Sequence, residues 1–119
     1  MANLNESLQD LMTLDGALCA AVVDYNSGML LASIGSGVDL ELAAAGNTEV
    51  VRAKMKTMKS LGLNDSIEDI LITLGKQHHI LRPAEKLNGI FIYYVLDSGR
   101  ANLALARRKI ADVESKITM

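Results

Sequence analysis

The chain has 119 residues, 50% of them hydrophobic, and its 12 basic and 14 acidic side chains leave a formal net charge of -2. This length predicts a single domain, residues 1–119, with a core of its own, and is too short for two domains of ordinary size. A charge so close to zero gives no field that would attract nucleic acid or an anionic membrane, so we expect neither as a partner.

The start of the chain has none of the features of an export signal. Residues 1–6 contain no basic side chain and no apolar core, and no apolar run in the sequence approaches the roughly 20 residues of a membrane span. The single cysteine, Cys19, lies within the apolar run 17–23, which indicates a small buried side chain and not a disulfide. We therefore expect a soluble cytoplasmic protein without membrane insertion.

Three elements are predicted in the first third of the chain. Asn3 and Glu6 have the spacing of a capping box, and leucines at helical spacing follow, which predicts a helix over about residues 4–14. Residues 17–24 are apolar on both faces and predict an interior strand. An Asn-Ser-Gly turn comes next and predicts that residues 29–34 return as the hairpin partner.

A long helix is predicted from Asp39, which is suited to cap it, to about residue 61. At about 100° per residue its apolar side chains form one broad stripe, which Asn47 and Lys54 interrupt. A stripe this wide is typical of a helix that packs on its own sheet and also against another chain, where an Asn can fix the register. The alternative is a helix edge at which Asn47 and Lys54 reach water. The stripe consists of Leu40, Ala43, Ala44, Val50, Val51, Met55, Met58 and Leu61.

Three strands and a helix are predicted in the second half. Residues 67–74 alternate in polarity and predict a one-sided strand at an edge of the sheet. Residues 77–82 predict a more polar strand, and residues 89–97, apolar at nearly every position, predict a central strand covered on both faces by helices. Residues 103–117 predict an amphipathic helix. The order is helix, strand, strand, helix, strand, strand, strand, helix, which is an α+β class.

The reactive residues do not form a recognisable catalytic or metal-binding set. His78 and His79 are adjacent on a strand, so their side chains point to opposite faces and cannot chelate one ion. Cys19 lies among aliphatic residues and lacks the exposed, activated thiol of a nucleophile. The glycines of residues 35–37 are not followed by the third glycine of a dinucleotide-binding fingerprint. We therefore expect no catalytic residues, no cofactor and no metal, and so no enzyme.

The one basic cluster lies around the start of the last helix. Such a cluster is most often a solvated helix face, and its alternative role is contact with a partner. The residues that a partner contact would use are Arg100, Arg107 and Arg108.

Three stretches in this element order carry a resemblance. They are the hairpin of residues 20–30, the central strand of residues 89–97, and the Asn-Leu-Ala-Leu-Ala-Arg-Arg-Lys block of residues 102–109. Together they resemble the roadblock/dynein light chain family over about residues 4–113. The resemblance implies a five-stranded antiparallel sheet with the long helix on one face and the terminal helices on the other, an α/β sandwich related to profilin-like and longin domains.

The resemblance also implies a function. Members of that family have no catalytic residues, dimerise through the long helix and the edge strand after it, and act as adaptors or regulators of Ras-like small GTPases or as light chains in motor complexes. The chain is therefore expected to be a homodimeric adaptor that binds a small GTPase or a motor subunit. The expected dimer interface consists of Asn47, Val51, Lys54, Met55, Met58, Ile70 and Ile72.

A second interpretation is a monomeric ligand-sensing domain of profilin-like shape. Its ligand would lie between the sheet and the long helix, in a pocket lined by Met55, Met58 and Tyr94. Flexible methionines can line adaptable pockets, although they more often fill a core.

Overall fold

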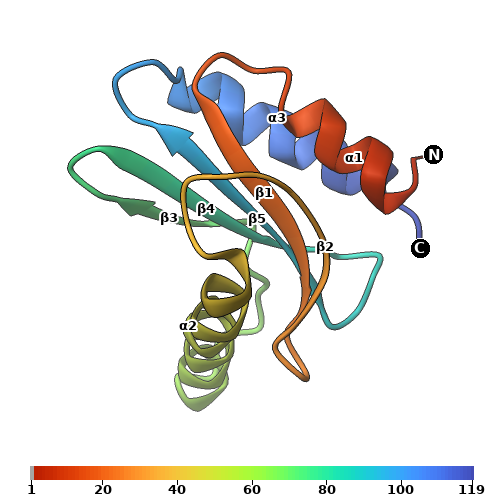
Figure 1. Ribbon diagram of the computed structural model, residues 1–119. Helices are drawn as coiled ribbons and strands as arrows, with labels where there is room; N and C mark the ends of the chain where they lie inside the picture. The colour runs from red at the N-terminus through yellow and green to blue at the C-terminus, as the bar shows by residue number, and fades with distance from the viewer. Residues whose placement is uncertain (1) are drawn as a thin grey trace.

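The structure is a computed structural model that describes residues 2–119. Its eight elements follow the expected order (Figure 1). They are α1 (Leu4–Leu11), β1 (Ala17–Asp24), β2 (Met29–Gly35), α2 (Leu40–Ser60), β3 (Ile70–Thr73), β4 (Gln77–Pro83), β5 (Ile90–Asp97) and α3 (Leu103–Lys116).

The five strands form one antiparallel sheet in the order β2-β1-β5-β4-β3. The expected central strand is β5, which pairs with β1 on one side and β4 on the other. All of its residues except the last are buried. The expected edge strand is β3, and β2 forms the opposite edge. The prediction of a five-stranded antiparallel sheet is confirmed.

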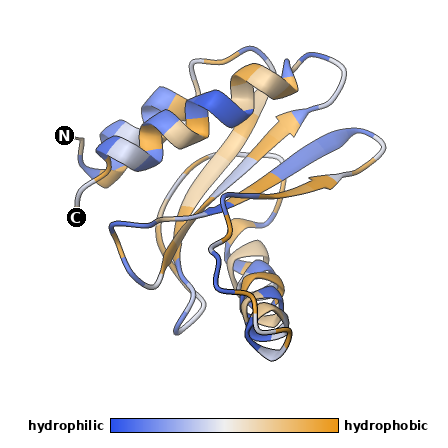
Figure 2. Cartoon of the chain, turned by 180° about the vertical axis from the view of Figure 1, so that it is seen from behind, coloured by the Kyte–Doolittle hydropathy of each residue, from blue (hydrophilic) through white to orange (hydrophobic). Residues whose placement is uncertain are grey.

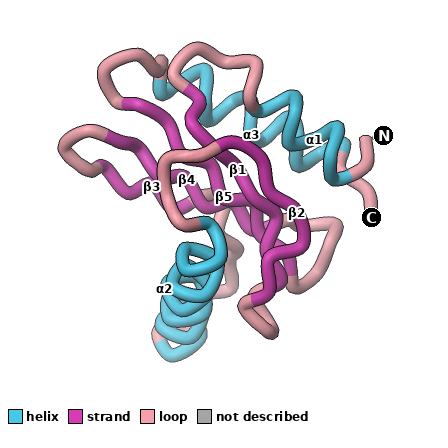
Figure 3. The backbone as a smooth tube through the Cα atoms, viewed as in Figure 1, coloured by secondary structure: helices cyan, strands magenta, loops and turns pink. Residues whose placement is uncertain are grey.

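Helices cover both faces of the sheet, as expected (Figure 3). Ile92 and Tyr94 of β5 pack in the cluster beneath α1 and α3, whereas Phe91 and Tyr93 pack in the cluster beneath α2. This separation follows from the pleat, because successive strand residues point to opposite faces and β5 is apolar at both sets of positions. The α+β sandwich with α2 alone on one face is confirmed.

Side-chain caps define where the three helices begin. The Asn3 side chain accepts from the Glu6 N–H at 2.8 Å, and the Glu6 carboxylate accepts from the Asn3 N–H at 3.2 Å, which completes the expected capping box. Asp39 caps α2 by accepting from the Leu42 N–H at 3.2 Å. In the same way Asn102 caps α3. Each cap satisfies a backbone donor that the first helical turn leaves without a partner.

Two predicted elements are longer than the observed ones. The first helix, expected to reach residue 14, ends at Leu11, whose carbonyl accepts a hydrogen bond from the buried Tyr94 hydroxyl. The Thr13 hydroxyl donates to the Asp10 carbonyl at 2.7 Å, so one distant and one local side chain satisfy two of the last carbonyls where the helix ends. The edge strand, expected over 67–74, is paired only from Ile70 to Thr73.

The two ends of the chain lie together on the side of α1 and α3 (Figure 1). Ala2 and Ile117 form a parallel bridge, in which the Ala2 N–H donates to the Lys116 carbonyl and the Thr118 N–H donates to the Ala2 carbonyl, each at 2.8 Å. The termini are therefore held away from α2.

Candidate interaction surface

The inner face of α2 packs on the sheet and buries part of the expected dimer interface. Val51 has no exposed surface, and Ala44 and Thr48 are buried beside it. The Thr48 hydroxyl donates to the Ala44 carbonyl at 2.7 Å, which allows this polar residue to lie in the core. Val51, expected at a dimer interface, is thus committed to the core of its own chain.

A hydrogen-bonded network of three side chains lies beneath α2. The Tyr93 hydroxyl bonds to His79 Nδ1 at 2.9 Å, and His79 Nε2 bonds to Gln77 Oε1 at 2.8 Å. Burial raises the pKa of Tyr93 to about 12, an effect that the Asn47 side chain opposes and Cys19 reinforces. Burial also lowers the pKa of His79. Asn47 is half-buried on α2.

The remaining residues of the expected interface lie at different depths. Lys54 is exposed on α2, and Met55 and Met58 are half-buried at its inner face. Ile70 and Ile72 are half-buried and pack with Met55 on the α2 side of the sheet. Leu71 between them packs on the opposite side, as alternation along β3 predicts. Ile70, Ile72, Met55 and Met58 therefore keep part of their surface accessible.

A second apolar face of α2 points away from the sheet, and sequence reasoning selected only its margins. We call it the outer face; all its members are exposed, and at helical spacing they lie within an arc of about 100° that contains no charged residue. Val50 and Leu61 belong to it and also to the broad stripe that the sequence predicts. Figure 2 shows polar and apolar bands alternating along α2. The outer face consists of Leu42, Gly46, Val50, Ala53, Thr57 and Leu61.

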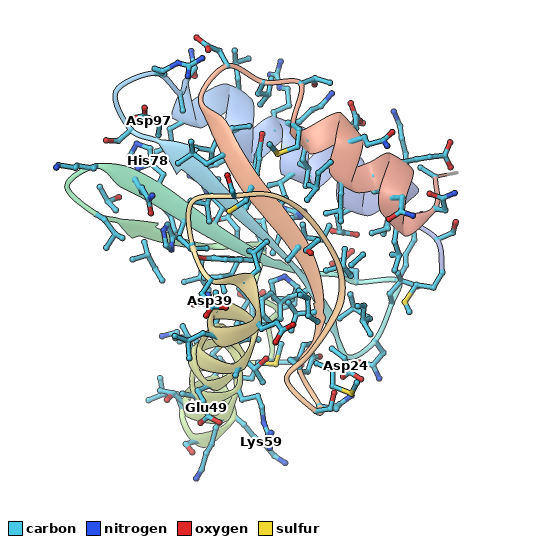
Figure 4. All side chains as sticks on the ribbon, in the orientation of Figure 1. Asp24, Asp39, Glu49, Lys59, His78 and Asp97 are labelled. Carbon is cyan, nitrogen blue, oxygen red and sulfur yellow. The ribbon has the colours of Figure 1, made fainter. Side chains whose placement is uncertain are left out.

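Charge is separated along α2. Its first half carries Glu41 and Glu49 and no basic residue, whereas residues 52–59 carry four basic residues and no acidic one. In Figure 4, the labelled Asp39 and Lys59 lie at opposite ends of the helix. Acidic residues at the start and basic residues at the end also suit the helix dipole. The helix therefore offers an acidic half and a basic half on either side of its middle.

A pocket of about 340 Å³ lies between the end of α2 and two loops of the sheet. Met55 and Met58 line it, as the ligand-sensing interpretation expected. Tyr94 does not, because its position on β5 directs it to the opposite face, beneath α1 and α3. That expectation was wrong. The lining residues are Tyr25, Met55, Met58, Lys59, Leu63, Asp65, Ser66, Ile67, Pro83, Ala84 and Glu85.

Two of the three arginines expected at a partner contact form ion pairs within the chain. Arg107 on α3 makes two hydrogen bonds of 3.1 Å to the carboxylate of Asp69, just before β3. Arg100 pairs with Asp15 at 2.6 Å, with both side chains largely exposed. Arg108 is exposed on the same helix. Arg107 thus ties α3 to the edge of the sheet.

Residues 2–119 hold no cluster of three or more His, Cys, Asp or Glu side chains arranged for a metal ion. Cys19 is buried, and desolvation raises the pKa of its thiol, which disfavours the nucleophilic thiolate. Figure 4 shows His78 near Asp97 at one end of the sheet, whereas His79 belongs to the network beneath α2. No helix in the described part of the chain has the length and apolarity needed to span a membrane.

Comparison with known proteins is informative only at the level of structure. No family model matches the sequence. No curated protein matches it either. A Roadblock/LC7 domain from Streptomyces avermitilis superposes with a TM-score of 0.82 at 12% identity, covering 96% of this chain and 93% of that one.

MglB structures give the same result. MglB from Myxococcus xanthus superposes with a TM-score of 0.74 at 20% identity, covering 92% of this chain and 83% of that one. The gliding protein MglB from Thermus thermophilus, and a structure described as MglB with tetrameric arrangement, each give 0.72 at 18% identity over 94% of this chain and 88% of theirs.

The sheet order and the two helical layers define an α+β sandwich. Among such sandwiches, the matched structures identify the type. The chain has the roadblock/LC7 fold.

Proposed function

We propose that this chain is a single-domain, non-catalytic adaptor, residues 1–119, that pairs with a second copy of itself and binds a Ras-like small GTPase or a motor subunit in the cytoplasm. The observation that carries the proposal is the outer face of α2, which leaves Leu42 71% and Leu61 65% exposed. The resemblance of the sequence to the roadblock/dynein light chain family and the roadblock/LC7 fold support the same function.

The spacing of the outer face is self-complementary for an antiparallel helix pair. A twofold axis beside residues 51 and 52 brings Leu42 opposite Leu61 of the second copy. The same axis brings Gly46 opposite Thr57, and Val50 opposite Ala53. Apolar and small side chains therefore meet along the whole length of α2, as an isologous contact requires. Burying this face removes apolar surface from water, which favours association.

Charge complementarity supports the antiparallel orientation over a parallel one. In the same register Glu49 lies beside Lys56 of the second copy on one flank, and Asn47 lies near Lys54 on the other. A parallel pair would place the acidic halves together and the basic halves together. We include β3 in the contact, because its free edge follows α2 in the chain and an unpaired edge is a site for strand addition. Ile70 and Ile72 remain proposed interface residues on that edge.

Replacement of Val50 by Asp tests the dimer. We expect Val50→Asp to convert the protein from dimer to monomer in light scattering at tens of micromolar, because pairing would bury an unpaired charge at the middle of the seam. Ala45→Asp, an equally new charge at an exposed position outside the outer face and about 140° around α2 from Val50, should leave the dimer intact. A wild-type protein that is strictly monomeric, or loss of the dimer in both variants, contradicts this interface.

A pull-down with the tagged protein tests the partner. From native lysate it should retain a small GTPase in amounts that differ between GDP and a non-hydrolysable GTP analogue, because an adaptor that biases nucleotide state must bind the two states differently. A motor subunit should be retained equally under both conditions. The absence of both classes of protein argues against the adaptor function.

The pocket at the end of α2 favours a second candidate function, binding of a small molecule. Its volume lies near the lower end of the range of ligand sites, and its lining is mostly apolar with a few polar groups. A thermal-shift screen of metabolites tests this function. Stabilisation by one chemical class that is lost in Met58→Trp, which would fill the pocket, supports ligand sensing. Equal stabilisation of the variant contradicts it.

A further inference from the structure

The other edge of the sheet, β2, is longer than β3 and carries no charge or proline, although a β-bulge interrupts its pairing with β1 at Leu31. Its seven residues, Met-Leu-Leu-Ala-Ser-Ile-Gly, contain no charge and no proline. Native proteins usually protect an exposed edge with a charge, a proline, a β-bulge or a very short strand, and of these β2 has only the bulge. The β3 edge has four paired residues and is preceded by the Arg107–Asp69 ion pair. The two edges therefore differ in how open they are to pairing.

The free side of β2 presents backbone hydrogen-bonding groups to solvent. Within residues 2–119, β1 is the only strand that pairs with β2, and no other backbone hydrogen bond reaches it. Exposure alternates along the strand, with Met29 63% and Leu31 37% exposed. Alternate residues of an edge strand direct their N–H and C=O groups outward. The backbone of another extended segment is the partner that can hydrogen-bond to all of these groups.

A shallow hollow beside the start of β2 indicates which charge an extended segment pairing with β2 would carry. It has a volume of about 350 Å³ and is lined by Gly28, Met29, Leu30 and Glu41. Glu41 is exposed in the first turn of α2, in the half of the helix that has no basic residue. A strand added along β2 would place alternate side chains on this side of the sheet, where a lysine or arginine reaches the carboxylate of Glu41.

From these observations we infer that β2 is a docking edge for an extended segment of a partner protein, with uncharged residues along most of its length and a basic side chain opposite Glu41. The segment adds as a sixth strand beside β2. Because β2 and β3 are at opposite edges, docking does not compete with the proposed dimer and does not depend on it.

The experiment uses the full chain, labelled with nitrogen-15, and short capped peptides as probes. One peptide alternates valine and threonine and carries a single arginine; a second has glutamate in place of the arginine; a third is the first with alternate amides N-methylated. We expect the arginine peptide to shift the resonances of Met29–Gly35 and slow their amide exchange. It should bind about three- to fivefold more tightly than the glutamate peptide, the range of one exposed ion pair. The N-methylated peptide should not bind.

Two matched variants test the edge and one tests the charge. Leu31→Lys places a charge on the β2 edge and should abolish binding, whereas Leu74→Lys places the same charge beside β3 and should not. Glu41→Lys should reverse the preference, so that the glutamate peptide binds more tightly. A thermal melt confirms that each variant is folded.

Several results would overturn the inference. They are the absence of any shift along β2 at saturating peptide, equal binding of the N-methylated peptide, or shifts confined to β3. Shifts of β2 that depend on protein concentration without peptide would instead assign this edge to a second copy of the chain.

Discussion

At the scale of single residues, the network beneath α2 makes stability depend on pH through His79. The ring accepts from the Tyr93 hydroxyl at Nδ1, so a proton added there removes a hydrogen bond, and burial already lowers the pKa of His79. In the unfolded chain the ring titrates near 6.5. Below that pH the unfolded state binds a proton more readily than the folded state, so the free energy of unfolding falls as the pH falls.

Urea unfolding at a series of pH values between 8 and 5 measures this dependence. We expect His79→Gln to lose less stability than the wild type across that range, because glutamine does not titrate. His78→Gln, which leaves the network intact, should keep the contribution of His79. A His79→Gln protein with the pH dependence of the wild type would show that the network does not control it.

At the scale of the element, Gly46 distinguishes the two faces of α2. It lies in the middle of a helix of 21 residues, and a Cβ at this position would meet nothing within 4 Å. Gly46→Ala should therefore raise the free energy of unfolding of the isolated chain by about 0.5–1 kcal/mol. If two helices approach closely there, the same methyl group should weaken their association.

Two measurements separate these effects. Thermal unfolding of Gly46→Ala in the monomeric Val50→Asp background should show a higher Tm than Val50→Asp alone. Sedimentation of Gly46→Ala alone should show a larger dimer Kd than that of the wild type. A variant that is more stable and dimerises as tightly as the wild type would place the helix contact away from Gly46.

At the scale of the whole molecule, the sequence predicted the centre of the sheet better than its surfaces. β1 and β5 are apolar on both faces, and only an interior strand needs that pattern. The stripe on α2 was wider than one helix face, and periodicity alone did not indicate which part of it meets the sheet. Buried Thr48 marks the inner face, and its polarity hid it from a search for apolar residues.

The candidate interface was harder to predict for the same reason. Val51 and Val50 are neighbours in sequence and equal in chemistry, yet Val51 is buried and Val50 is 39% exposed. The heptad-like spacing of Leu42, Gly46, Val50 and Ala53 was the signal in the sequence that could have selected the outer face. Recognising this spacing as an outer face requires knowing which side of α2 packs on the sheet, and only the fold shows that.

Hydrogen exchange tests the assignment of both edges at this scale. When the protein concentration is raised through the Kd of the dimer, the amides of Ile70–Thr73 should gain protection and those of Met29–Gly35 should not, because only β3 belongs to the proposed contact between copies. If the amides of β2 gained protection instead, β2 and not β3 would be the edge that joins the two copies.

The bridge between Ala2 and Ile117 brings the two ends of the chain within reach of a short peptide linker. The sequence can therefore be joined into a ring and reopened elsewhere, for example in the turn at Gly75 and Lys76, which connects β3 to β4. Such a circular permutant keeps every strand in its place in the sheet while moving both chain ends next to β3. New termini there would obstruct one edge of the sheet and leave the other open.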